Sequence, residues 1–162
     1  MNQEDYNKSL DLIEEIITSG PQNEEAIEIL IKSKLGLNQI DEVKEIIQSL
    51  EEKLKKNKNI ISAINAYDLY LNAKNSGSLE DLNELVKKDP LNIENNKKLS
   101  DLYFSEKNYS KAFGIILELF KKSKNNNRGE IKKILFNYFE VLGDTHEQTK
   151  RARRKLSSLI FS

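Results

Sequence analysis

The stretch NYSKAFGIILELF, residues 108–120, carries the pattern that decides the fold. A small residue, Ala112, is followed four and seven positions later by the apolar residues Ile116 and Leu119, which places all three on one face of a helix. Two helices can cross closely where one offers a small side chain, and apolar residues a turn or two further on fill the space between neighbouring helix pairs. The stretch therefore predicts the second helix of a packed helix pair.

The same pattern occurs in three more stretches of the chain, DYNKSLDLIEEIITSGP (5–21), QIDEVKEIIQSL (39–50) and GSLEDLNELVKKDP (77–90). Each begins its pattern with a small or β-branched residue, and these leading positions are 34, 35 and 34 residues apart. The leading residues are Ser9, Val43, Ser78 and Ala112, and the apolar pairs that follow are Ile13 and Ile16, Ile47 and Leu50, Leu82 and Leu85, and Ile116 and Leu119.

A repeated helix pair of this length resembles the tetratricopeptide repeat, whose period is 34 residues. Pro21 and Pro90, the only prolines, both lie twelve residues after a leading position, where this repeat ends. In the first helix of the last full repeat, Leu99, Ser100 and Tyr103 take the places of the repeat's large, small and aromatic residues. Because one helix pair cannot bury both of its faces alone, such repeats must stack.

We therefore predict an all-α fold, a tetratricopeptide-like right-handed α-α superhelix with a C-terminal capping helix. A single domain over residues 1–162 is expected, beginning inside a repeat with a second helix at 4–18. The final helix pair is expected to turn at Gly143, as a helix C-cap, and to restart at THEQ with Thr145 as N-cap and Gln148 three residues on. The expected units are repeats at about 22–56, 57–90 and 91–124 and a final helix pair at 128–162, and the expected helices are 4–18, 23–35, 39–55, 60–74, 79–88, 92–105, 109–123, 129–142 and 146–160.

Composition argues against most catalytic chemistry. The chain has no Cys, so thiolate metal sites and thiol catalysis are excluded for it, and its single His146 has no second His or Cys with which to share a metal. It has no Gly-rich phosphate loop, and adjacent carboxylates such as Glu24 and Glu25 point apart on a helix. We therefore expect no enzyme activity, no catalytic residues, no metal and no cofactor.

Charge and hydropathy set expectations for location and partners. No apolar run approaches the length of a membrane span, and the start of the chain lacks a signal pattern, so a cytoplasmic protein with no membrane partner is expected. The net charge is zero, yet residues 1–50 carry eleven acidic and four basic side chains whereas residues 121–162 carry eleven basic and four acidic ones. Such a gradient can orient a partner, although charge on helices more often serves solubility.

The segment RARRKLSSLIFS, residues 151–162, holds three of the four arginines followed by apolar residues. Three interpretations are open: a structural cap, a docking helix for a partner, or a nucleic-acid patch. We expect no nucleic-acid binding, because no aromatic residue interleaves the basic cluster. Ala152, Leu156, Leu159 and Ile160 share a helix face suited to capping, which leaves an outer edge for a partner protein. The partner-binding candidates on that edge are Arg151, Arg153, Arg154 and Phe161.

A second candidate surface is a groove on the first helix of a repeat. Tyr67 and Tyr70 lie three residues apart in such a helix, where they can line a groove for an extended segment or pack in the core. The oligomeric state stays open at this point.

Residues 61–162 resemble something narrower, the C-terminal region of the chaperedoxin family of bacterial thioredoxin-like co-chaperones. The marks are the helix ILFNYFEVLG ending at Gly143, and Asp89-Pro90, Leu99, Tyr103, Ala112, Leu117, Arg153, Arg154, Leu156, Leu159 and Phe161. The resemblance implies an upstream thioredoxin-like domain outside this chain, holdase activity toward unfolded client proteins, and docking on a GroEL-type chaperonin through the C-terminal helix. The alternative function is a generic tetratricopeptide scaffold that recognises one peptide or partner in a multiprotein assembly.

Overall fold

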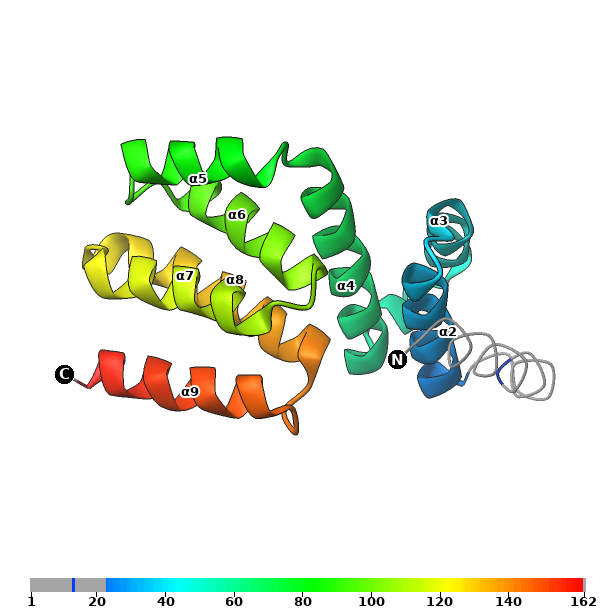
Figure 1. The fold of residues 1–162 in the computed structure, drawn as a ribbon. Coiled ribbons are helices and arrows are strands. Elements are labelled where there is room, and N and C mark those ends of the chain that lie inside the picture. The colour runs from blue at the N-terminus through cyan, green and yellow to red at the C-terminus, as the bar shows by residue number, and fades with distance from the viewer. Residues whose placement is uncertain (1–12, 14–22, 162) are drawn as a thin grey trace. The chain divides into compact units, whose positions relative to one another are not determined.

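The computed structural model describes residue 13 and residues 23–161 (Figure 1). Every regular element in these ranges is helical, and no strand occurs in them. The predicted helix over 4–18, with its leading Ser9, and Pro21 lie outside the described residues, apart from Ile13, which is helical and buried. The all-α prediction is therefore confirmed.

The helix boundaries follow the expected periodicity closely. In chain order the helices are α2 (Glu24–Gly36), α3 (Ile40–Ser49), the short 3₁₀ helix η1 (Leu54–Lys56), α4 (Lys58–Asn75), α5 (Leu79–Lys88), α6 (Ile93–Ser105), α7 (Tyr109–Lys122), α8 (Asn125–Leu142) and α9 (Glu147–Ile160). Two expectations were wrong. The helix expected over 39–55 ends at Ser49, and the helix expected from residue 129 already begins at Asn125.

The chain forms two compact units, Met1–Asp68 and Leu69–Ser162, and the division falls within α4. In the first unit α2 packs against α3. The centre of this unit is a cluster of buried aliphatic residues: Ile27, Ile31, Val43, Ile60 and Ala63. The sequence predicts a single domain of stacked repeats over residues 1–162, and this domain assignment remains a prediction.

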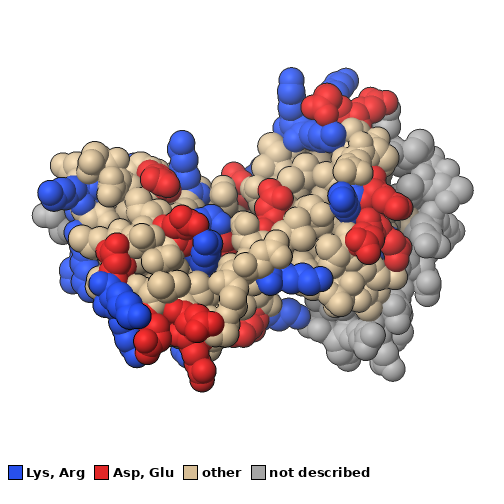
Figure 2. Space-filling view, turned by 90° about the horizontal axis from the view of Figure 1, so that it is seen from above, with Lys and Arg blue, Asp and Glu red and all other residues tan. Residues whose placement is uncertain are grey.

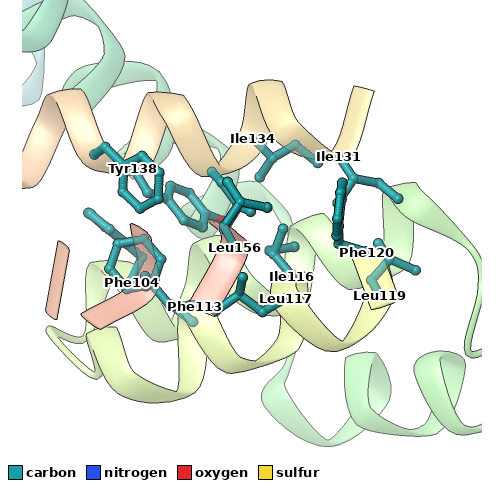
Figure 3. Packing of buried hydrophobic residues seen from close by; sticks show 14 of the residues in the cluster. Phe104, Phe113, Ile116, Leu117, Leu119, Phe120, Ile131, Ile134, Tyr138 and Leu156 are labelled. Carbon is teal, nitrogen blue, oxygen red and sulfur yellow. The ribbon is translucent and has the colours of Figure 1, made fainter. Parts of the chain in front are cut away.

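The second unit holds the larger core, where α7 packs against α6, α8 and α9 (Figures 1 and 3). Its centre is aromatic: the Phe104 and Tyr138 rings stack at 4.6 Å between centroids, and Phe113 meets Tyr138 edge-on at 5.9 Å. Ala112 is fully buried where α7 crosses α6, as the small residue of the pattern predicts. Within the second unit, the helices thus bury their apolar faces against those of the next pair, as repeat stacking requires.

Side-chain caps fix where several helices begin. Asn23, Asn92 and Asn108 each accept a hydrogen bond from the backbone N–H three residues on. Ser78 does the same for Asp81 and also donates to the Asp81 carboxylate at 2.7 Å. The prediction that Ser78 is the small residue at a helix crossing was therefore wrong, because its hydroxyl caps the backbone of α5 and its side chain is exposed.

The turn between α8 and α9 confirms one sequence prediction and corrects another. Gly143 ends α8 with φ of 86°, a left-handed conformation that favours glycine, and its N–H donates to the Phe139 carbonyl at 2.8 Å. The N-cap of α9 is His146 rather than Thr145, since His146 Nδ1 accepts the hydrogen bond of the Gln148 backbone N–H at 3.2 Å. The His146 ring also meets the edge of Tyr109, with 5.4 Å between centroids.

Gly114 lies in the interior of α7, and a Cβ atom added there meets no atom within 4 Å. We expect Gly114→Ala to raise the free energy of unfolding by about 0.5–1 kcal/mol, because glycine in a helix interior loses more backbone entropy on folding than alanine does. Urea denaturation followed by circular dichroism measures the change. A loss of stability instead would mean that α7 tolerates no side chain at this position.

Candidate functional site

The inner face of α9 closes the stack of helices in the second unit. Thr149, Ala152 and Leu156 are buried there, and Leu159 packs half-buried against the same aromatic core. Leu156 lies among the core side chains contributed by α7 and α8 (Figure 3). The spacing of these residues by three and four is what makes one face of the helix apolar. The predicted C-terminal capping helix is confirmed, but Ile160, expected on the same face, is 44% exposed.

Two of the three clustered arginines already have partners within the chain. Arg151 Nε donates to Glu147 Oε1 at 3.1 Å, one turn earlier on α9. Arg153 Nη2 donates to Asp144 Oδ1 at 2.6 Å, and its guanidinium carbon lies 4.5 Å from the centroid of the Phe139 ring. These exposed pairs contribute little to stability, but they fix the direction of both side chains.

Arg154 is the arginine that faces solvent without an ion pair. No carboxylate of the described residues lies within 4.0 Å of its guanidinium. Phe161, the C-cap residue of α9, follows seven residues later, about two helical turns on, and 87% of its surface is exposed. Arg154 and Phe161 therefore form an outer stripe with no role in the core, and we call it the outer stripe of α9.

A second exposed aromatic is Phe136 of α8, which is 46% exposed. The buried residues of α6 recur in α8 after 35 positions, so Ser100 corresponds to Leu135 and Phe104 to Phe139. In this alignment Phe136 takes the place of Asp101, which is fully buried where α8 stacks on α6. Phe136 thus occupies the position on which a following helix would pack.

Some charged side chains elsewhere are paired along their own helices. Lys32 with Glu28, Lys98 with Glu94 and Lys122 with Glu118 are all one turn apart. In Glu94, the hydrogen bond and the charge of Lys98 hold the pKa of the carboxyl below its usual value. Figure 2 shows basic and acidic side chains intermingled over the described part of the face seen from above. These three pairs engage six of the charged side chains on these helices.

The two candidate groove tyrosines belong to one helix but to different units. Tyr67 packs half-buried against the aliphatic cluster of the first unit, which supports its packing role. Tyr70 lies in the second unit and is also half-buried. A groove lined by both remains a prediction.

Sequence reasoning missed a buried polar cluster that joins α6 to α8. The Tyr138 hydroxyl donates to Asp101 Oδ1 at 2.6 Å and lies 2.9 Å from Ser100 Oγ, while Ser100 donates to the Ala112 carbonyl at 2.9 Å. Lys97 Nζ lies 2.5 Å from the other Asp101 oxygen. Burial raises the pKa of Asp101, and the bonds from Lys97 and Tyr138 offset part of that rise. Burial beside this carboxylate also raises the pKa of Tyr138 well above its usual value.

This cluster ties α6 to α7 and α8. Its members bond to one another and to the backbone, and a pair of carboxylates for acid–base work is not part of it. The described residues contain no group of three or more His, Cys, Asp or Glu placed to hold a metal ion. Among the same residues, no helix combines the length and the apolar character that crossing a membrane requires.

A family model for the tetratricopeptide repeat matches residues 72–161, which is more than half of the chain. The chain belongs to the tetratricopeptide repeat family. The match covers the end of α4 and all of α5 to α9, the helices whose stacking is described above. Searches of curated proteins and of solved structures gave no match. Tetratricopeptide repeats build extended binding surfaces from stacked helix pairs, so membership indicates a module for protein–protein interaction, typically a scaffold without catalysis.

Proposed function

We propose that this tetratricopeptide chain docks on a partner protein through the outer stripe of α9, and that the partner is a GroEL-type chaperonin. Two observations support this docking surface. Arg154 has no carboxylate partner among the described residues, and Phe161 is 87% exposed. The resemblance of residues 61–162 to chaperedoxins supports the choice of partner. A chaperonin partner implies a cytoplasmic location.

Arg154 and Phe161 suit an interface for physical reasons. Arginine and aromatic residues are enriched at interfaces and carry much of the binding energy there. Arg151 and Arg153 are less available, because each already bonds to a carboxylate of this chain. We therefore rank Arg154 and Phe161 above the other two arginines as contact residues.

Holding of unfolded clients is the second half of the proposal and rests on the same resemblance. A generic scaffold for one partner is the competing function, and promiscuity separates the two. We expect the chain to suppress aggregation of several unrelated unfolded proteins in a light-scattering assay. Suppression of none of them would favour the scaffold.

The docking surface is tested by pull-down of purified GroEL with the full chain. We expect Arg154→Glu and Phe161→Ala each to reduce binding about tenfold or more, which corresponds to at least 1.4 kcal/mol lost at an interface hot spot. Lys44→Glu, which reverses an exposed charge on α3, is the matched control and should bind as the unchanged chain does. Circular dichroism checks that all variants fold equally.

Two results would contradict the proposal in different ways. If the unchanged chain captures no GroEL, the chaperonin is not the partner and the scaffold function gains. If it captures GroEL and the two α9 variants capture as much, the contact lies elsewhere on the molecule.

A further inference from the structure

A groove of about 470 Å³ opens in the second unit, between α5 and α7, with α6 as its floor. Figure 1 shows α6 beside both of these helices, which pack on it. This volume is within the range of natural ligand sites, which are mostly apolar and carry a few polar groups. The apolar lining consists of Val86, Pro90, Leu99, Tyr103, Ile115 and Leu119. The groove shares none of these residues with the outer stripe of α9.

Gly114 in the wall of the groove has no explanation in the packing of this chain. It lies in the middle of α7, and the space where its side chain would begin is open to at least 4 Å. A glycine in a helix interior destabilises the helix, and none of the described residues approaches closely enough to require it. A glycine on an open helix surface allows the backbone of another helix to come close.

The dimensions and hydrogen bonds of the groove favour a helix as its occupant. The wall on α7 runs from Lys111 to Lys122, about three turns or roughly 16 Å. An extended peptide would need partners for its backbone groups, and the amide nitrogens of the groove already donate within the chain: Asn96 Nδ2 to the Pro90 and Asn92 carbonyls, and Asn83 Nδ2 to the Leu79 carbonyl. A helix satisfies its own backbone.

Charge at one end of the groove specifies the partner further. Lys111 Nζ lies 4.9 Å from the centroid of the Tyr103 ring, and no carboxylate within the described ranges lies within 4.0 Å of it. At the other end, Lys122 is paired with Glu118 at 3.2 Å. The groove therefore presents one positive charge that is not neutralised, next to an apolar floor.

We propose that this groove binds an amphipathic α-helix of a partner protein, with apolar side chains on the α6 floor, its backbone close to Gly114, and a carboxylate at Lys111. The site is separate from the outer stripe of α9, so the chain has two docking surfaces. The inference stands whether or not the partner at α9 is a chaperonin.

The probe for this site is a phage-displayed library of helical peptides of about 16 residues, long enough for four turns. Peptides selected on the full chain are synthesised, and their dissociation constants are measured by fluorescence anisotropy. We expect the selected peptides to carry apolar residues spaced by three and four with a flanking Asp or Glu. Gly114→Leu fills the groove from its wall, and Lys111→Glu reverses its charge, so each should weaken binding tenfold or more.

Two controls separate blocking of the groove from general effects of substitution. Gly114→Ala changes the same backbone position with a much smaller side chain and should weaken binding less than threefold. Gly129→Leu adds the same side chain in open space at the start of α8, outside the groove, and should leave binding unchanged. Peptides in which the flanking acidic residue is replaced by lysine should bind the Lys111→Glu variant more tightly than they bind the unchanged chain.

The proposal is overturned by any of three results. The first is that selection enriches no peptide. The second is that the selected peptides bind Gly114→Leu as well as they bind the unchanged chain. The third is that the enriched peptides are proline-rich, extended sequences, and each of these results would rule out a helix in this groove. Circular dichroism of Gly114→Leu confirms that loss of binding is not loss of fold.

Discussion

Leu156→Ala is expected to lower the free energy of unfolding of the second unit by about 3 kcal/mol. Leu156 is 4% exposed, and its side chain points from α9 into the aromatic core (Figure 3). Truncation to alanine removes apolar contacts and leaves a cavity that rigid rings fill poorly, so the transfer and cavity contributions add. For a unit of this size the melting temperature should fall by roughly 12–24 °C.

The matched control is Ile160→Ala, one turn further along the same helix. Ile160 is 44% exposed, so its truncation should change stability by no more than about 0.5 kcal/mol. Thermal and urea denaturation of both variants give the comparison. Equal effects of the two truncations would mean that α9 does not dock on the core through the face that bears Leu156.

The sequence predicts the helices well because their periodicity and caps are local. The range of α5 is as expected, and α7 ends one residue earlier than predicted, each starting at a side-chain cap that a short stretch encodes. The match of the tetratricopeptide family to residues 72–161 supports the repeat assignment that the pattern predicted.

The spacing misleads where one repeat is shortened. α5 has 10 residues whereas α7 has 14. The position twelve residues before Pro90 is therefore Ser78, the N-cap of α5, rather than a residue in the interior of the helix. The buried residue that corresponds to Ala112 is Leu82, since both lie four residues after the N-cap of their helix. For the same reason Leu85, expected to be packed, is 43% exposed.

Contacts between residues far apart in the sequence could not be predicted from local patterns. Asp101 and Tyr138 are 37 residues apart, and no local pattern distinguishes a buried aspartate from a solvated one on a charged helix. The groove between α5 and α7 likewise depends on how three helices pack. Gly114 was the one local signal for it, because a glycine in the middle of an apolar helix needs a reason.

Tyr138→Phe is expected to lower stability by about 2 kcal/mol at neutral pH, because the hydroxyl is a buried hydrogen-bond donor to a carboxylate. The variant leaves Asp101 buried with Lys97 as its remaining charged partner. Tyr103→Phe is the matched control. Its side chain is half-buried, no hydrogen bond of its hydroxyl occurs within the described residues, and its effect should not exceed about 0.5 kcal/mol.

The effect of Tyr138→Phe should also depend on pH. Burial raises the pKa of Asp101 in the folded state above its unfolded value, so the folded state binds this proton more tightly. The stability that the group contributes is then fully present below the unfolded pKa and is lost as pH rises through the folded pKa. Removing the hydroxyl removes a bond that lowers this pKa, which moves the folded pKa further up. The deficit of the variant should therefore grow from acid to neutral pH.

An Asp101→Asn background isolates this effect, because asparagine does not titrate. We expect the difference between tyrosine and phenylalanine at position 138 to be independent of pH in that background and to increase with pH when Asp101 is present. Urea denaturation of the four proteins between about pH 4 and 7 measures both differences, a range that starts near the unfolded carboxyl pKa. A deficit that stays constant across this range with Asp101 present would show that the carboxylate does not couple to the hydroxyl.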